Sequence, residues 1–190
     1  MADPTPTLDA TIGGPNANSY VTLAQANAYF DNSPYSQDWK NHSDAFKEAA
    51  LIQATQYLDA LAWAGSCCAS TQRLQWPRKG ITCRCKEAVC TEIPNDIETA
   101  TCELAFQLAH DPDAITGNVK GNGATGPIKE QQLGDLKQSF YEPPSGPSGS
   151  KYPPTAPLVL QTYPWLGDLI GSCWLTGSYG SSRILARVRS

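Results

Sequence analysis

Residues 43–64, SDAFKEAALIQATQYLDALAWA, decide the fold of the chain. Apolar side chains recur in this stretch at spacings of three and four residues, which places them on one side of a helix. These side chains are Phe46, Ala49, Ala50, Ala54, Tyr57, Leu58 and Leu61. Ser43 or Asp44 can cap the start of the helix, and Gly65 follows its end. Nothing on this helix looks catalytic, so the stretch predicts a core helix on which other elements pack.

A second, shorter helix is predicted before this one. In SYVTLAQANAYFDN (19–32), Thr22 and Gln25 have the spacing of a capping box. Leu23, Ala26 and Phe30 then mark one face of the helix. Residues 31–42, with Pro34 and Trp39, are predicted to form the loop that leads into the core helix.

A third helix is predicted from Pro94 to His110, with Pro94 in its first turn. Its apolar stripe consists of Ile97, Ala100, Thr101, Leu104, Ala105 and Leu108. Farther along, the runs 127–133 and 136–141 are separated by Gly134 and Asp135, which is the signal of a β-hairpin. A last short helix is predicted near 164–170, with an end as far as Leu175.

The predicted fold class is therefore mainly α. It is a small bundle of about three core helices plus a short C-terminal helix, with a small β-hairpin and extended N- and C-terminal arms. In chain order the segments are a flexible arm at 1–18, a helical core at 19–141, a Pro/Ser/Gly linker at 142–157, and a C-terminal helix and tail at 158–190. The core includes a cysteine-rich insert at 81–92 and the hairpin at 127–141.

Composition excludes several classes of protein. A length of 190 residues suits one domain with a real core. A net charge of −4 argues against a protein whose whole surface binds nucleic acid. No apolar run reaches the roughly 20 residues that span a bilayer. The N-terminus lacks the charged start and apolar centre of a signal peptide, so we expect assembly in a cytoplasm and no membrane partner.

Five of the seven cysteines lie between residues 67 and 90. Thiolates for a structural zinc ion could come from Cys67, Cys83, Cys85 and Cys90. The paired C-x-x-C spacing is absent, however, and adjacent or one-apart cysteines fit a single tetrahedral site poorly. A local disulfide and free thiols are the other two interpretations, and a disulfide forms only outside a reducing cytoplasm. The sequence predicts no cofactor and no metal.

The segment LQWPRKG (74–80) is predicted to have a structural role. A residue before proline favours extended geometry, so Trp76 and Pro77 should fix the path of the chain, and Gly80 should close a turn. We expect the indole of Trp76 to close the core. Arg78 should fix the turn, with its side chain pointing outward.

No pattern in the sequence indicates catalysis. His42 and His110, the two histidines, lie in a loop and at a helix end, where solvated side chains are expected. The chain lacks the nucleophile elbow, the Walker A loop and the dinucleotide fingerprint. The run GNVKGNGATG (117–126) does not follow a strand and open a helix, so it indicates a flexible loop. We therefore expect a protein that is not an enzyme.

Four motifs, in this order and spacing, resemble the head–tail connector (neck adaptor) family of tailed bacteriophages. They are SYVTLAQANAYF (19–30), the W-x-x-x-S-D-x-x-K-E-A-A-L-I-x-A-T-x-x-L-D run that ends at Asp59, LQWPRKG (74–80) and IPNDIETATCELA (93–105). Part of this family carries the label DnaT-like single-stranded DNA-binding. The resemblance is close over 19–110 and extends through the hairpin to the Y-P-W-L helix. The cysteine-rich insert and the long linker depart from the family pattern.

The resemblance implies a structural virion protein of the neck. Copies would form a homo-oligomeric ring, expected to match the twelve-fold symmetry of the portal, between the portal protein and downstream neck, tail-terminator or tail proteins. Double-stranded DNA would pass through the lumen without sequence-specific binding. The ring would assemble in the bacterial host cytoplasm and remain in the virion at the head–tail interface.

The C-terminal segment is the first candidate for docking to the portal or to a neighbouring copy. The predicted docking residues are Trp165, Leu166, Leu169, Ile170, Arg183, Ile184, Arg187, Val188 and Arg189. The first four form an apolar face on a tethered helix, and that face could instead fold back onto the core of its own chain. The alternative function is a single-stranded DNA-binding module, although the basic residues cluster only at the C-terminal end.

Overall fold

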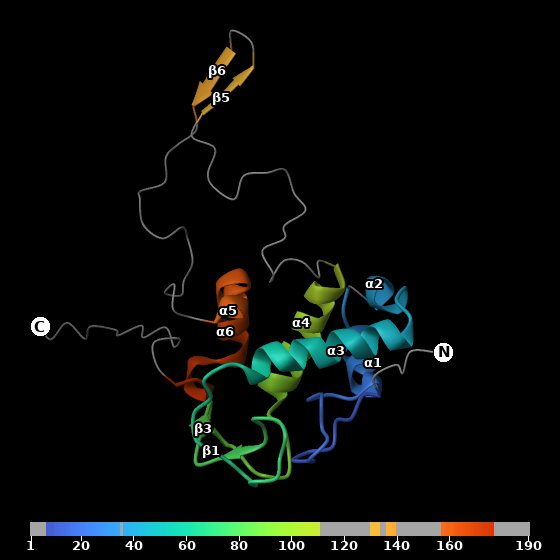
Figure 1. Cartoon of the computed structure of the whole chain (residues 1–190), viewed down its shortest axis with the longest axis vertical. Helices are drawn as coiled ribbons and strands as arrows, with labels where there is room; N and C mark the ends of the chain where they lie inside the picture. Colours follow the sequence, from blue (N-terminus) through green and yellow to red (C-terminus); the bar gives the residue numbers. More distant parts are fainter. Residues whose placement is uncertain (1–6, 35, 111–129, 134–135, 140–156, 177–190) are drawn as a thin grey trace, which may run out of the picture.

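The computed structural model describes residues 7–34, 36–110, 130–133, 136–139 and 157–176. These residues form a mainly α fold with small antiparallel β pairs, as the sequence predicts (Figure 1). The helices are α1 (Leu23–Asp31), α2 (Ser36–Lys40), α3 (Asp44–Asp59), α4 (Asn95–His110), α5 (Leu158–Thr162) and α6 (Pro164–Ile170), followed by the 3₁₀ turn η1 (Ser172–Trp174). The strand pairs are β1 (Ser66–Cys67) with β2 (Arg78–Lys79), β3 (Thr82–Cys83) with β4 (Lys86–Glu87), and β5 (Glu130–Leu133) with β6 (Leu136–Ser139).

The start of α1 confirms the predicted capping box. The backbone N–H of Gln25 donates to Thr22 Oγ1 at 3.1 Å, and the N–H of Thr22 donates to Gln25 Oε1 at 2.8 Å. The loop predicted for residues 31–42 is wrong in part, because α2 lies within it. Trp39 of α2 is buried, its ring centroid is 4.6 Å from that of Phe30, and its Nε1 donates to Asn27 Oδ1 at 2.9 Å. These contacts between α1 and α2 order a turn that the local sequence does not signal.

Helix α3 begins at its predicted cap but ends before the predicted Ala64. Ser43 Oγ accepts from the N–H of Phe46 at 3.3 Å, and the helix ends at Asp59. Beyond it, the indole of Trp63 donates to the carbonyl of Leu58 at 3.0 Å. Trp63 also forms an isolated antiparallel bridge with Leu175. Trp63, which was predicted to be helical, therefore pairs with the C-terminal segment instead.

The buried face of α3 is rotated from the predicted one. The buried residues are Lys47, Ala50, Leu51, Ala54, Thr55 and Leu58. Phe46, predicted to be in the core, is 42% exposed and stacks on His42, and Ala49 is exposed as well. The apolar residues of this helix cover too wide an arc for spacing alone to select one face. Packing against α4 determines which face of α3 is buried.

Helix α4 confirms its prediction, since every residue of the predicted stripe is buried. Pro94 accepts from the N–H groups of Ile97 at 2.8 Å and Glu98 at 3.2 Å, which closes the first turn. The contact between α3 and α4 is the most extensive between any two elements of the described chain, and α6 packs on α4 as well (Figure 1). The α3–α4 pair is thus the centre of the fold.

Two further predictions concern the ends of the core. Residues 7–18, predicted as part of a flexible arm, form a loop in which the N–H of Asp9 donates to Asn18 Oδ1 at 2.7 Å and the N–H of Asn18 donates to the Asp9 carbonyl at 2.8 Å. The β5–β6 hairpin is confirmed, with Leu133 opposite Leu136. It lies apart from the helices in Figure 1. The predicted linker at 142–157 lies outside the described residues except for Pro157.

Candidate functional site

Helix α6 carries the four predicted docking residues that the structure describes. Leu166 and Ile170 are fully buried in the core of the same chain, so this helix adopts the folded-back arrangement that the sequence left open. The other predicted docking residues lie outside the described part of the chain; they are Arg183, Ile184, Arg187, Val188 and Arg189.

Three residues that follow α6 anchor the C-terminal segment to the rest of the fold. A disulfide joins Cys173 to Cys83, with their Cα atoms 5.4 Å apart. The indole of Trp174 donates to Asp96 Oδ2 at 3.0 Å. The N–H of Thr176 donates to the carbonyl of Ala62 at 2.8 Å. Because these anchors hold α6 on α4, Leu166 and Ile170 are not accessible to a partner while the fold is intact.

Trp165 and Leu169, on the outer side of α6, line a groove of about 670 Å³. The groove lies between α1, α4 and α6. Its lining residues are Tyr29, Glu103, Phe106, Gln107, Trp165, Asp168 and Leu169. Trp165 is 36% exposed, whereas Phe106, which also lines the groove, is buried. An exposed indole beside a concave apolar surface is the arrangement that recurs at protein-binding hot spots.

Two acidic residues, Glu103 and Asp168, are among the described residues that line the groove. Tyr29 donates its hydroxyl to Glu103 Oε1 at 2.6 Å, and burial together with this carboxylate raises the pKa of Tyr29. The hydrogen bond holds Glu103 in place at the wall. The described lining of the groove is therefore apolar around Trp165 and Leu169, beside a carboxylate that is already hydrogen-bonded to Tyr29.

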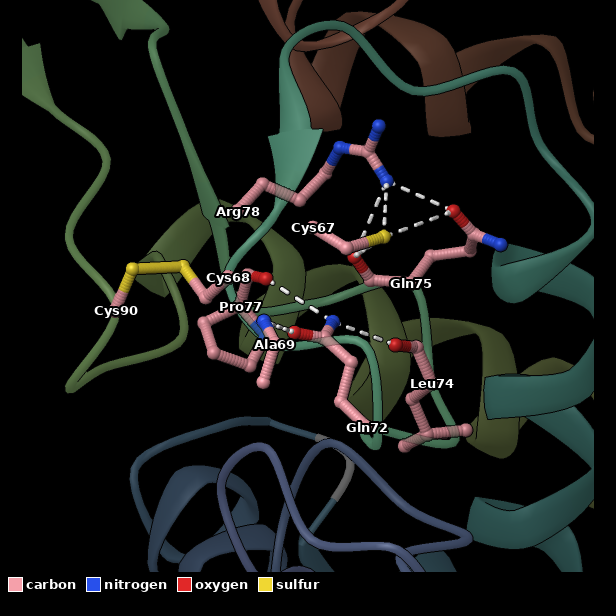
Figure 2. The surroundings of a disulfide bond; sticks show 9 residues. All are labelled: Cys67, Cys68, Ala69, Gln72, Leu74, Gln75, Pro77, Arg78 and Cys90. Atoms are coloured by element: carbon pink, nitrogen blue, oxygen red, sulfur yellow. Dashed lines mark hydrogen bonds between the residues drawn. A yellow bond between two sulfur atoms is a disulfide. The ribbon is translucent and has the colours of Figure 1, made fainter.

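Arg78 does not point outward, contrary to the sequence prediction. The residue is 7% exposed, and its side chain lies beside Cys67 and Gln75 (Figure 2). Nε donates to the carbonyl of Ala64 at 2.6 Å and Nη2 to that of Gly65 at 2.8 Å. Nη1 donates to Gln75 Oε1 at 2.8 Å and lies 3.4 Å from Cys67 Sγ. A buried guanidinium with this many acceptors is a structural clamp.

Trp76 lies in the core, as a residue that closes it would. It is 1% exposed, and its ring meets those of Trp63 and Trp174 edge to face, with centroids 5.4 and 5.3 Å away. Pro77 is buried beside it. This segment therefore joins the end of α3 to the C-terminal segment.

Four of the seven cysteines form two disulfides, an arrangement that differs from the zinc set considered from the sequence. Cys68 pairs with Cys90, with their Cα atoms 5.6 Å apart, and Cys83 pairs with Cys173. Two of the four zinc candidates are therefore bonded to other cysteines. Cys67 and Cys85 are exposed thiols, and no group of metal-ligating side chains forms among the described residues. Burial, with Glu98 and Glu103 nearby, raises the pKa of the remaining thiol, Cys102, to about 12.

The pairing with Cys173 could not be derived from spacing, because 90 residues separate the two cysteines. Cys173 stands outside the cluster at 67–90, but so does Cys102, so the sequence did not single out Cys173 as the partner. The two histidines lie on aromatic rings: His42 stacks on Phe46 at 4.7 Å between centroids, and His110 lies 4.3 Å from Phe106. His110 is exposed and His42 is half-buried.

The helical body lacks a basic surface among its described residues. Across 7–34, 36–110 and 157–176 there are 12 acidic and 7 basic residues. Three of the basic side chains face carboxylates, in the pairs Lys40–Asp31, Lys47–Asp44 and Arg84–Asp96. A continuous positive face of the kind that tracks a nucleic-acid backbone is not formed by these residues.

The described residues form a small helical protein with two disulfides and a partly apolar groove between α1, α4 and α6. Residues 7–173 match the family described as "Putative DnaT-like ssDNA binding protein", and the chain therefore belongs to this family. No curated protein and no solved structure shows a significant match to the chain. Among the described residues, no helix is both long enough and apolar enough to cross a membrane.

Proposed function

We propose that this protein is a non-enzymatic adaptor of the neck of a tailed bacteriophage. It forms a ring under the portal, joins the capsid vertex to the tail and lines the DNA channel. Its partners are the portal protein, downstream neck or tail proteins, and further copies of itself. It assembles in the bacterial host cytoplasm and remains in the virion.

The groove between α1, α4 and α6 carries the proposal. Its apolar wall and exposed Trp165 suit another protein. The phage context comes from the ordered motifs at 19–30, 39–59, 74–80 and 93–105. Three of those motifs fold into helices α1, α3 and α4, and the fourth contains the buried Arg78. A rigid body that holds a docking groove is what an adaptor ring requires.

Electron microscopy of the protein mixed with its portal protein tests the proposal. We expect rings stacked coaxially on the portal, and we expect Trp165→Ser to reduce their number. Phe46→Ser is the matched control, because Phe46 is an aromatic residue of similar exposure that lies outside the groove. A monodisperse monomer that ignores the portal at micromolar concentration would overturn the adaptor function.

A second candidate function is supported by the family description, which names single-stranded DNA binding. For this function, the contacts with DNA would come from Arg183, Arg187 and Arg189 and from lysines outside the helical body. The test is fluorescence anisotropy with a labelled oligonucleotide at increasing salt. Salt-dependent binding that is lost on deletion of 183–190 favours this function. Equal, weak binding by the full chain and the deletion variant rules it out.

A further inference from the structure

We propose that the Cys83–Cys173 disulfide is a redox-controlled latch for the segment 157–176, which contains α5, α6 and η1. Oxidation holds this segment closed on α4, and reduction allows it to open and close as a unit. The latch is separate from the adaptor function, because it can be tested on the purified chain alone. It stands or falls whether or not rings form on a portal.

Segment 157–176 depends on the rest of the fold for its order. Helix α5 has five residues and α6 has seven, and isolated helices shorter than about 12–15 residues are marginal in water. The segment is instead ordered by the burial of its apolar side chains, which are Val159, Leu160, Leu166, Ile170 and Trp174. Because its helices are not stable apart from this burial, the segment should leave the core as one unit.

The disulfide lies where it can control that opening. Cys173 is in η1, after α6, and Cys83 is in β3, so the bond joins the C-terminal part of the segment to the β3–β4 hairpin. The other covalent connection runs along the chain, through residues 111–156 that precede the segment. With the bond formed, the segment is restrained at both ends and has few open conformations. Reduction removes one restraint and allows many more.

The polar contacts near the disulfide are reversible. The indole of Trp174 donates to Asp96 Oδ2 at 3.0 Å, and the N–H of Thr176 donates to the Ala62 carbonyl at 2.8 Å. Both hydrogen bonds can be exchanged for hydrogen bonds to water on opening, so the net stabilisation that each gives is modest. These contacts guide the segment back to its closed position, but only the disulfide holds it there covalently.

The disulfide is accessible from one side. Cys173 is exposed, whereas Cys83 is 2% exposed. Thiol–disulfide exchange begins when a thiolate attacks one sulfur of the bond, and its rate depends on access to that sulfur. A small thiol such as glutathione should therefore attack at Cys173.

The reaction is balanced by glutathione and its disulfide. A glutathione thiolate attacks Cys173 Sγ, which forms a mixed disulfide with Cys173 and releases Cys83 as a thiolate that takes up a proton. A second glutathione thiolate attacks the glutathione sulfur of the mixed disulfide. This step gives glutathione disulfide and the Cys173 thiolate, which is also protonated. Glutathione disulfide is the oxidant that reverses both steps and closes the latch.

The remaining cysteines define the test protein. Cys67 and Cys85 are exposed free thiols that can exchange with either disulfide, so the parent chain for the tests carries Cys67→Ser and Cys85→Ser. Cys102 stays in place, because it is buried and its raised pKa of about 12 keeps it a thiol. The Cys68–Cys90 disulfide (Figure 2) joins residues 22 positions apart and does not involve segment 157–176, so it provides the matched control.

The first test measures hydrogen–deuterium exchange in two variants of this parent. The latch variant carries Cys83→Ala with Cys173→Ser, and the control variant carries Cys68→Ala with Cys90→Ser. We expect amides of residues 158–175 to exchange about tenfold faster or more in the latch variant than in the parent, while amides of the α3–α4 pair stay protected. In the control variant, residues 158–175 should exchange at the rate of the parent.

Two outcomes of this test overturn the proposal. An unchanged exchange rate in residues 158–175 of the latch variant would show that the bond does not control opening. An equal acceleration in α3, α4 and α6 would show that the bond stabilises the whole fold and that the segment does not open separately.

The second test titrates the latch in the control variant, which keeps Cys83 and Cys173. The protein is equilibrated with glutathione and glutathione disulfide at a series of ratios, and the reduced fraction of Cys173 is measured by alkylation and mass spectrometry. We expect exchange in residues 158–175 to rise with that fraction and to fall again when glutathione disulfide is added. A Cys173 that stays oxidised in millimolar glutathione, or that is reduced without faster exchange, refutes the latch.

Discussion

The α3–α4 pair and the segment between residues 60 and 94 are stabilised in different ways. The helix pair buries apolar stripes, with Leu51, Leu58 and Leu104 fully inaccessible. The segment between them contains two-residue strands and few regular hydrogen bonds. It is held by the Arg78 clamp and two disulfides. Burial of a continuous apolar surface needs no particular partner atom, whereas a clamp or a disulfide needs specific ones.

This difference predicts where the protein tolerates change. Loss of one apolar group in the helix pair leaves many other contacts in place, so its effect depends on the cavity left behind. Loss of one polar partner in the 60–94 segment leaves buried carbonyl groups without donors.

Removal of the Cys83–Cys173 disulfide should have the largest effect on the oxidised protein. Its two cysteines are 90 residues apart, and chain-entropy arguments give about 4–5 kcal/mol for a loop of that size. The variant Cys83→Ala with Cys173→Ser should lower the free energy of unfolding accordingly in urea titrations. Cys85→Ser, at an exposed free thiol, is the control and should change little. Identical urea midpoints for the variant and the native protein would contradict the prediction.

Replacement of Arg78 should have the next largest effect. Arg78→Met keeps the length of the stem but removes the donors to Ala64, Gly65 and Gln75. We expect a loss of about 3–4 kcal/mol in the free energy of unfolding, because buried carbonyl groups lose charged donors. Arg73→Met, at an exposed arginine, should change stability by less than about 0.5 kcal/mol. Equal stability of the two variants would show that the clamp is dispensable.

Two glycines allow backbone strain to be separated from steric exclusion. Gly65 and Gly80 have φ of +70° and +75°, and a Cβ at Gly80 would meet nothing within 4 Å. A Cβ at Gly65 would lie 2.5 Å from the Lys79 carbonyl oxygen and would also collide with Ile81. We expect Gly80→Ala to lower the free energy of unfolding by about 1 kcal/mol and Gly65→Ala by about 2–3 kcal/mol. Thermal melts of the two variants measure the difference, and a smaller loss for Gly65→Ala would refute it.

The smallest expected effect is a pH dependence from the helix pair. Burial and the neighbouring Glu92 raise the pKa of Glu98 in α4. Above its ordinary pKa of about 4.3, the folded state therefore holds this proton more tightly than the unfolded state, and stability falls as pH rises through the window between the two values. Glu98→Gln removes the titrating carboxyl group and its contribution to the pH dependence of stability. Its stability relative to the native protein should rise, by less than about 1 kcal/mol, as the pH increases from about 4 to about 6. Parallel stability curves would contradict the assignment.

The two regions also differ in how far they could be predicted. Helix α4, the caps at Thr22 and Ser43 and the β5–β6 hairpin follow from residues a few positions apart, and the structure confirms them. Helix α2 was missed because Trp39 is ordered by Phe30 and Asn27, which lie on α1. The orientation of Arg78 was predicted wrongly for a similar reason. Arginine usually lies at the surface, and only the carbonyl groups of Ala64 and Gly65 make this one a buried clamp.

The sequence alone determined the helices that repeat an apolar spacing and begin at a cap, because backbone hydrogen bonds and side-chain caps act within a few residues. The tertiary structure decided which face of α3 is buried, where α6 packs, and that Cys173 reaches Cys83. It also made the groove, since Tyr29, Phe106 and Trp165 come from three helices that meet only after folding. These features depend on contacts between distant residues, and burial and charge at such contacts are properties of the packed chain.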